Sequence, residues 1–561
     1  MKRFRLILIL SFFIFAGQAC SKQSINNFRK LSITEYCLPS DSIDFTISEA
    51  ERVWDKSPWK GKYSQDDFIQ YVLPPFAAKE PIQFYWRMDI PQRLGIEPTE
   101  SIFTTANEIN RKINIVTKNE AWGNAQSSYS EIMAGKTGKC DDRTTVTVLA
   151  MRAYGIPAAF DYIPSWGSTN NGHSFCSVIL PSDSLLVYQN RQDNGSAPSF
   201  AHKIPKIYRR CFFPQHNLLS KYRGSEYIPE EVNDLCCKDV TRSHKVGCAD
   251  VKLPINECNN KLAYLCVFSP KGWIPIAYGE TANGKVNFHD IGNGAEYEFM
   301  KKGENIGDGI LYLPVIYDGQ TQTPIGKPFI LSRKGVNPIT YINKTETVTL
   351  GRKYPRLERI IRFAELMKDG RFEASNKADF SDAVCLYQID SCPQSNFQIK
   401  KVKVLSKHKF KYARYIKSNG TFSLSELAFY DCRGHKIEGE SLIPEYIERS
   451  ELSMLYDGNP LSYYEIGGIL DFWGGMEFDQ PTEIGFVGFC PRTDANDIEI
   501  GDEYELFYWD DQWKSLGKKK AEANTIIFDD VPQNALLWLR DLTKGREERP
   551  FTYSEGRQIW W

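Results

Sequence analysis

The sequence predicts a multidomain protein in which an α+β domain precedes all-β sandwich domains. Its 561 residues exceed the length at which a single hydrophobic core stops growing. Helical periodicity dominates up to about residue 155, and strand-like runs of period two follow it. Beyond about residue 239 nearly every apolar run alternates and is bounded by Gly, Asn or Pro.

Composition and charge indicate an ordinary globular protein. The chain is 42% hydrophobic and 25% charged, and its net charge is −1. A nucleic-acid-binding protein would carry a basic surplus, so we expect no nucleic acid partner.

Residues 1–20 have the pattern of a secretory signal. A basic MKRFR precedes the apolar run LILILSFFIFA, which is too short for a good membrane span. The ending GQAC resembles a bacterial lipoprotein signal, which implies a lipid on Cys20 and attachment to a membrane. Ordinary cleavage after Ala19 is the alternative. Residues 21–43 then read as a polar tether.

The next predicted domain spans residues 44–238. Helical patterns include SQDDFIQYVLPPF and IFTTANEINRKINIV, and a further helix begins near Cys140 and ends before Gly155. The runs HSFCSVIL and SLLVYQN, separated by a PSD turn, predict a β-hairpin.

Cys140 and His173 are candidates for a nucleophile and its base. The dipole and unpaired N–H groups at a helix start favour the thiolate form of a cysteine. Asp141 and Asp142 suit the first turn of a helix as solvated acids, and their charges could also disfavour the thiolate, so the sequence leaves the direction of the thiol pKa shift open. A histidine distant in sequence but adjacent in space completes the minimal pair, and Gln189 or Asn190 could orient its ring.

These residues carry a family resemblance. Cys140 followed by TVLAMRAYGIPAAF, then GHSF and a hairpin, resembles the transglutaminase-like superfamily, which shares the papain-like cysteine-protease core. The resemblance implies Cys140 as nucleophile and His173 as general base. Gln189 stands where the family has Asp. A neutral amide orients an imidazole without supporting its charge, and Asn190 or Asp193 could substitute.

The cysteine count predicts disulfides in an exported chain. Fourteen cysteines are present, and six of them crowd between residues 211 and 266: Cys211, Cys236, Cys237, Cys248, Cys258 and Cys266. Zinc is disfavoured because the chain has no C-x-x-C pair and few histidines in this region.

The C-terminal half is predicted to be all β. We expect a small sandwich over 239–345, a linker with first strands over 346–394, and a jelly roll over 395–561. KYARYIKSNGTFSLSELAFYD, LYDGNPLSYYE and MEFDQPTEIGFVGFCPRTDAN occur in the order typical of discoidin-type, galactose-binding-like domains. The closing segments resemble those of large exported Bacteroidetes proteins, which implies a Gram-negative envelope and an outer-membrane lipoprotein.

The sequence leaves the roles of candidate ligand-binding residues in this last region undecided. Trp473, Trp509 and Trp513 could stack on sugar rings or fill a core. Asp457 and Asn459 could hold a structural calcium or form a plain turn.

Two functions follow. The first is an exported thiol enzyme acting on peptide or glycopeptide amides through Cys140, His173 and Gln189, with no catalytic cofactor or metal. The second is a catalytically degenerate scaffold that binds a surface glycan or a partner protein.

Overall fold

The structure is a computed structural model, and two compact units account for its backbone. It describes residues 23–117, 127–195, 200–255, 258–295, 303–393, 398–404, 406–442, 453–545 and 547–561. The first unit comprises Met1–Glu298 with Asp308–Pro338, and the second comprises Phe299–Gly307 with Ile339–Trp561. The chain is therefore multidomain, with an α+β part followed by antiparallel β sheets, as the sequence predicts.

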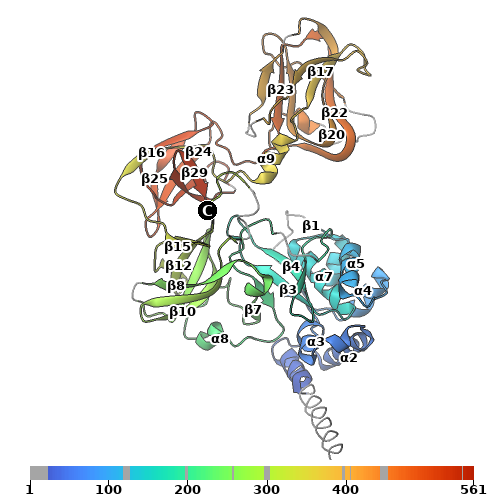
Figure 1. Cartoon of the computed structure of the whole chain (residues 1–561), viewed down its shortest axis with the longest axis vertical. Helices are drawn as coiled ribbons and strands as arrows, with labels where there is room; N and C mark the ends of the chain where they lie inside the picture. Colours follow the sequence, from blue (N-terminus) through green and yellow to red (C-terminus); the bar gives the residue numbers. More distant parts are fainter. Residues whose placement is uncertain are drawn as a thin grey trace, which may run out of the picture. The chain divides into compact units, whose positions relative to one another are not determined.

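Helices form the N-terminal part of the first unit (Figure 1). Residues 23–34 are helical, and the helices that follow are α2 (Ser40–Lys56), η1 (Lys60–Lys62), α3 (Gln65–Tyr71), α4 (Trp86–Leu94), α5 (Ile102–Lys112), α6 (Tyr129–Gly135) and α7 (Cys140–Ala153). Two short helices, α8 (Leu218–Tyr222) and η2 (Arg242–His244), come later in the chain. Every residue of α7 from Asp142 to Ala153 is buried. A helix that is covered all round lies at the centre of a core.

A five-stranded sheet packs against α7. Its order is β5-β4-β3-β6-β7, and every pairing is antiparallel. The strands are β3 (Ala158–Ile163), β4 (His173–Ile179), β5 (Leu185–Tyr188), β6 (Tyr208–Arg210) and β7 (Cys237–Asp239). Strands β4 and β5 form the predicted hairpin, with Cys176 opposite Tyr188. A short parallel pair, β1 (Val116–Thr117) and β2 (Thr137–Gly138), leads into α7.

A second sheet completes the first unit. The expected sandwich at 239–345 is a single continuous ladder of eight strands, ordered β15-β14-β12-β9-β10-β11-β8 with β13 on β12. The strands are β8 (Cys248–Pro254), β9 (Leu262–Ser269), β10 (Gly272–Ala282), β11 (Lys285–Gly292), β12 (Ile310–Asp318), β13 (Thr321–Pro324), β14 (Phe329–Ser332) and β15 (Gly335–Pro338). Two buried side chains tie it to the preceding domain: Lys203 Nζ donates to Gly309 O at 2.6 Å, and Tyr208 OH donates to Ile276 O at 3.0 Å.

The second unit consists mainly of β strands in separate sheets, and its described residues include the helix α9 (Glu358–Glu365). A seven-stranded sheet holds β17 (Arg371–Ser375), β18 (Val384–Gln388), β19 (Lys400–Lys403), β20 (Lys409–Tyr430), β21 (Gly439–Leu442), β22 (Tyr464–Glu483) and β23 (Phe486–Pro491). A five-stranded sheet holds β24 (Glu503–Trp509), β25 (Trp513–Lys520), β27 (Leu537–Asp541), β28 (Pro550–Ser554) and β29 (Arg557–Trp560). Strand β16 (Thr345–Leu350) pairs with β26 (Ile526–Pro532). Residues 395–561 are therefore divided between two groups of strands.

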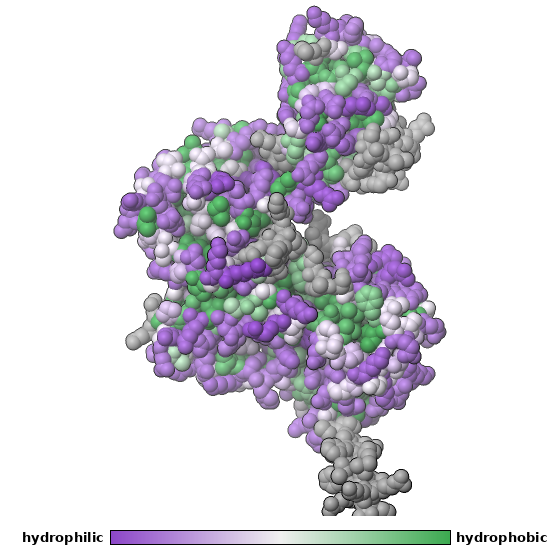
Figure 2. All heavy atoms as spheres, in the orientation of Figure 1, coloured by the Kyte–Doolittle hydropathy of each residue, from purple (hydrophilic) through white to green (hydrophobic). Residues whose placement is uncertain are grey.

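Surface character gives no sign of a spanning segment. Hydrophilic residues predominate on the face of both units drawn in Figure 2. Within the described ranges, no helix combines the length and the apolar character that a bilayer crossing needs. The predicted signal at 1–20, including Cys20, lies outside the described residues.

The segment predicted as a tether is partly structured. Phe28, in the helix over 23–34, is 1% exposed and stacks on Phe212 with ring centroids 4.5 Å apart. Ser32, one turn later, is also buried. The prediction for 21–43 therefore failed over 23–34, because a short run with only a few apolar residues on one face shows little periodicity in the sequence.

We predict that Phe28→Ala lowers the free energy of unfolding by about 3 kcal/mol, because the substitution removes a buried ring from the core. Chemical denaturation followed by circular dichroism measures this change. Ile33→Ala is the matched control, since Ile33 lies on the same helix and is 50% exposed. Equal effects of the two substitutions would show that the segment does not contribute to the core.

Candidate active site

The site begins at the first turn of α7. Cys140 is its first residue, and Lys139 N donates to Asp142 Oδ2 at 2.9 Å. A Cβ on Gly138 would lie 2.7 Å from the Asp142 Cβ, so only glycine leaves room for this carboxylate to fold back over the helix start. Asp142 is thereby committed to capping, which is the structural role expected of a first-turn acid.

The Cys140 thiol is half-buried and surrounded by opposing influences. Burial is the largest, and it raises the pKa of the Cys140 thiol; the negative charge of Asp141 raises it further. The thiol lies 3.8 Å from Asp141 Oδ1. Hydrogen bonding from the side chain and main chain of Ser174 lowers the pKa but does not reverse its direction. Burial, with the charge of Asp141 added to it, therefore outweighs the thiolate-favouring effect expected of a helix start.

His173 and Gln189 form a hydrogen bond. Gln189 directly follows β5, whose last registered pair is Cys176 opposite Tyr188. Extending that register by one residue places Gln189 opposite Phe175 and diagonal to His173, on the same face of the sheet. His173 Nε2 lies 3.1 Å from Gln189 Oε1. Because an amide oxygen only accepts, Nε2 carries the proton and Nδ1 keeps a lone pair that can act as a base.

Aromatic rings enclose the His173 imidazole. The Trp166 ring stacks on it with centroids 5.7 Å apart, and the Phe175 ring lies at 6.1 Å. Burial is the main influence and lowers the pKa of His173, whereas the Gln189 hydrogen bond and the charges of Asp141 and Asp193 raise it. A Cβ on Gly172 would lie 2.4 Å from Ile163 O, so the chain enters β4 through a gap that only glycine fits.

Helix α7 and strand β4 bring Cys140 and His173 into one region. Ser174, next to His173, donates from its hydroxyl to Thr144 Oγ1 at 3.3 Å. Thr144 lies four residues after Cys140 and therefore on the same face of α7. Among the described residues, no hydrogen bond joins the thiol to the imidazole. In enzymes this contact often tightens only when substrate binds.

The loop after β5 is held by a partly buried hydrogen-bond network. Asp193 Oδ2 accepts from Asn190 N at 3.0 Å and from Gln189 N at 2.5 Å. Asn110 Nδ2 donates to Asn190 O at 2.9 Å and to Asp193 O at 3.1 Å. Arg143 Nη2 donates to Asn110 Oδ1 at 2.8 Å, so the network reaches α7 three residues after Cys140.

No protein-family model matches the chain, and no curated protein matches it. The solved structures that resemble it weakly include the following three. One is a cysteine protease of Cytophaga hutchinsonii, with 16% identity over 19% of this chain and a TM-score of 0.17. The match covers 38% of that protein. The calcium-bound LapG of Legionella pneumophila is 15% identical over 28% of this chain and 82% of its own, with a TM-score of 0.17. The EGTA-treated LapG is 16% identical over 31% and 92%, with a TM-score of 0.18. Scores this low carry no functional argument, and the site rests on its own geometry.

Sequence reasoning named the main side chains and missed their supports. Of the alternatives for orienting the imidazole, Gln189 makes the contact; Asp193 binds main-chain amides, and the Asn190 side chain accepts from Gln192 N. Trp166 and Asn110 were not predicted. The only signals in the sequence were a tryptophan seven residues before His173 and an asparagine on the buried face of a helix.

The six crowded cysteines do not form disulfides in the described structure. Their thiols have local partners instead. Cys236 Sγ lies 3.7 Å from Tyr36 OH, and Cys237 Sγ lies 3.2 Å from Tyr162 OH. The predicted pairing therefore failed, because spacing in the sequence did not show that these residues lie on different strands and bends.

Two carboxyl groups of the second unit lie beside each other, although the described residues contain no group of three or more His, Cys, Asp or Glu side chains that could hold a metal ion. Glu426 on β20 is buried, and its Oε1 has no hydrogen-bond partner. Burial and the adjacent Asp457 raise the pKa of Glu426 to about 8. Asp457 accepts from Asn459 N at 2.8 Å and from Ser462 Oγ at 2.8 Å. Oxygen ligands of this kind suit Ca²⁺.

The three candidate sugar-stacking tryptophans have protein neighbours. Trp509 is buried, and Trp513 lies on it with ring centroids 5.1 Å apart. Trp473 lies 5.6 Å from the Phe380 ring and 5.5 Å from the Arg414 guanidinium. Each ring has a structural role, and glycan binding by them stays a prediction.

We predict that Asp141→Asn speeds alkylation of Cys140 several-fold near pH 7.5. The carboxylate raises the pKa of the thiol, so removing its charge lowers that pKa and increases the thiolate fraction. The measurement is the rate of iodoacetamide labelling at Cys140, read by mass spectrometry. Asp66→Asn, at the start of α3, is the control. A rate that falls or does not change would contradict the electrostatic account.

Proposed function

We propose that the first unit is a thiol-dependent amide hydrolase or acyltransferase with a papain- and transglutaminase-like arrangement. The observation that carries the proposal is the His173–Gln189 hydrogen bond, which leaves Nδ1 as a base beside a helix that begins with Cys140. Peptide or glycopeptide amides are the substrate class, because a thiol nucleophile with an adjacent base attacks acyl carbons.

The chemistry proceeds in two steps. His173 Nδ1 takes the thiol proton as Cys140 Sγ attacks the amide carbonyl carbon. The carbon–nitrogen bond then breaks, the imidazolium returns the proton to the leaving amine, and a thioester remains. Water or an amine attacks the thioester carbon, His173 takes the proton of the attacking group, and the thiol is released with that proton. The Cys140 N–H, in the unpaired first turn of α7, supports the oxyanion.

The neutral partner shapes this mechanism. Gln189 fixes the tautomer of His173 but supplies no negative charge for the imidazolium. The lowered pKa of His173 and the raised pKa of Cys140 favour a neutral thiol with a neutral imidazole at rest. Proton transfer therefore accompanies attack, as in general-base catalysis, instead of preceding it.

The setting is proposed from the sequence. A signal ending at Cys20 supports export and lipid attachment in a Gram-negative envelope. The discoidin-like order of motifs in the second unit supports targeting through a glycan-binding-like module.

A scaffold function is the second candidate. The raised thiol pKa, the absence of a thiol–imidazole hydrogen bond in the described residues and the neutral Gln189 all favour it. The chain would then bind a surface glycan or a partner protein without turnover.

We also propose a structural Ca²⁺ held by Glu426 and Asp457. The unpartnered Glu426 Oε1 and the second carboxyl group beside it fit a cation. The ion would stabilise the β20 region and take no part in the chemistry of Cys140.

We predict that Gln189→Glu increases alkylation of Cys140 at pH 6–7 by about tenfold, because an anion beside Nε2 stabilises the imidazolium–thiolate pair. Gln189→Ala should lower both alkylation and any amide hydrolysis. Asn190→Asp is the control, since it adds the same charge one residue away. Cys140→Ala should abolish hydrolysis. If it leaves hydrolysis of peptide amides intact, the enzyme proposal fails and the scaffold candidate takes its place.

The calcium site predicts a pH-dependent stability. The pKa of Glu426 is raised in the folded protein, from 4.5 to about 8. Its contribution to folding is therefore complete below pH 4.5 and is lost as the pH rises through 8. In EGTA, calorimetry should show a lower melting temperature at pH 8 than at pH 5, and Ca²⁺ at 100 times its Kd should restore about 2.7 kcal/mol.

Glu426→Gln should remove both the Ca²⁺ response and this pH dependence. Glu438→Gln, at an exposed position, is the control. A Ca²⁺ response that survives Glu426→Gln would place the ion elsewhere.

A further inference from the structure

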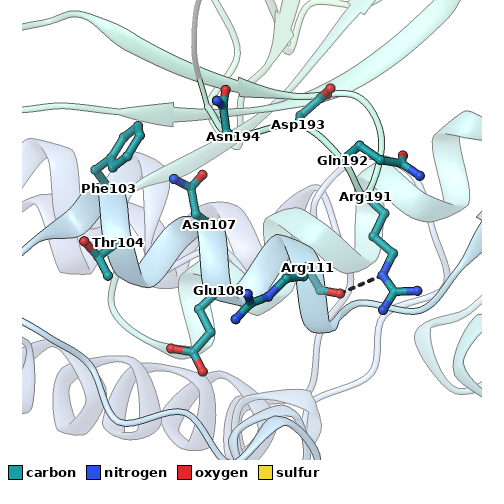
Figure 3. Close-up of a pocket in the computed structure, with 9 residues that line it drawn as sticks. All are labelled: Phe103, Thr104, Asn107, Glu108, Arg111, Arg191, Gln192, Asp193 and Asn194. Atoms are coloured by element: carbon teal, nitrogen blue, oxygen red, sulfur yellow. Dashed lines mark hydrogen bonds between the residues drawn. The ribbon is translucent and has the colours of Figure 1, made fainter.

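A cavity of about 730 Å³ lies between α5 and the loop after β5. Residues of α5 that line it are Phe103, Thr104, Asn107, Glu108 and Arg111, and the loop contributes Arg191, Gln192, Asp193 and Asn194. Figure 3 shows Phe103 toward one end of the lining and Arg191 toward the other. Volumes of this size accommodate small ligands or a short peptide segment.

Two guanidinium groups provide the charge of the cavity. Arg191 donates from Nε to Arg111 O at 2.9 Å and from Nη1 to Asn114 Oδ1 at 3.4 Å, which holds it along the wall and leaves Nη2 without a partner among the described residues. Within the described residues, the Arg111 guanidinium has no hydrogen bond or ion pair, and both arginines are exposed. Arginine forks of this kind match carboxylates.

The acidic residues of the lining are committed elsewhere. The Asp193 carboxylate accepts from the Gln189 and Asn190 main chain, and Glu108 lies 3.4 Å from Lys112 Nζ. Both carboxylates keep their negative charge, so the lining holds two positive and two negative groups. Each carboxylate already has its own partners, whereas the two arginines have no carboxylate partner within the described residues. At the other end, the Phe103 ring is 49% exposed.

The distance between Phe103 and Arg111 along α5 sets the spacing of the side chains that a bound peptide would need. Eight residues separate Phe103 from Arg111, which is about 12 Å along the helix axis. An extended peptide covers that distance in three or four residues.

The same loop carries Gln189. Asp193 caps the main-chain amides of Gln189 and Asn190 from the cavity wall, and Asn110 holds the loop from α5. An occupant of the cavity thus contacts the segment that orients the His173 ring.

We propose that this cavity binds an acidic peptide segment, with an apolar side chain against Phe103 and a carboxylate three or four residues away against Arg111 and Arg191. This binding site defines a substrate class for the proposed thiol chemistry. Its role in catalysis rests on that proposed function. Binding itself does not require turnover.

The test uses the full chain with Cys140→Ala and fluorescence anisotropy. The probe is a fluorescein-labelled decapeptide with Phe followed at three and four residues by Asp and Glu, and the matched probe has Asn and Gln there. We expect the acidic probe to bind at least about tenfold more tightly. The double substitution Arg111→Ala with Arg191→Ala should erase that difference, and Phe103→Ser should weaken both probes.

Controls separate the alternatives. Arg52→Ala removes an equal charge on α2 and should change nothing. Arg111→Glu should reverse the preference toward a Lys-bearing probe, which a merely unfolded variant would not do. Equal affinity for the two probes, or displacement of the acidic probe by millimolar free glutamate, would overturn the assignment to a peptide.

The two proposals fail separately. With Cys140 intact, the arginine substitutions should lower kcat/KM for acidic substrates and leave kcat/KM for the matched amide substrates unchanged. Absence of turnover on every substrate would remove the enzyme proposal and leave the binding result standing. Turnover without acidic preference would remove only the cavity assignment.

Discussion

The burial of α7 is the constraint on which the first unit depends. A helix that is covered all round cannot leave polar side chains to water, so each must find a partner inside the core. Arg152 donates to Phe76 O at 2.7 Å and to Ala158 O at 3.0 Å, and Arg143 donates to Asn110. These bonds tie the helix to the segment before α4, to β3 and to α5. The thiol at the start of α7 is consequently fixed relative to the sheet that carries His173.

This packing also sets the electrostatics of the site. Burial disfavours charge on both partners, which raises the pKa of Cys140 and lowers that of His173. An acidic residue behind the imidazole would counter this effect, but Gln189 is neutral. The described residues therefore place a neutral thiol and a neutral imidazole in one region without a preformed ion pair. In the function proposed above, substrate binding would supply part of the driving force, through the loop that holds Gln189.

The loop after β5 links recognition to the base. Its main chain is bonded to Asn110 on one side, its Asp193 carboxylate holds Gln189 on the other, and its Arg191 lines the cavity. These hydrogen bonds connect the cavity lining to the segment that carries Gln189. The local sequence does not reveal this link, because Asn110 and the loop residues that it binds lie about 80 residues apart along the chain.

The sequence by itself determined the order of an α+β part and β sheets, the helix that begins at Cys140, and the hairpin of β4 and β5 with His173 at its start. Those features depend on periodicity and turn residues, which are local. Only the tertiary structure decided the role of Gln189 over Asp193, the enclosure of His173 by Trp166, the local partners of the cysteines and the helix that buries Phe28. Each of these depends on which distant segments pack together, and a residue's own neighbours along the chain do not record that.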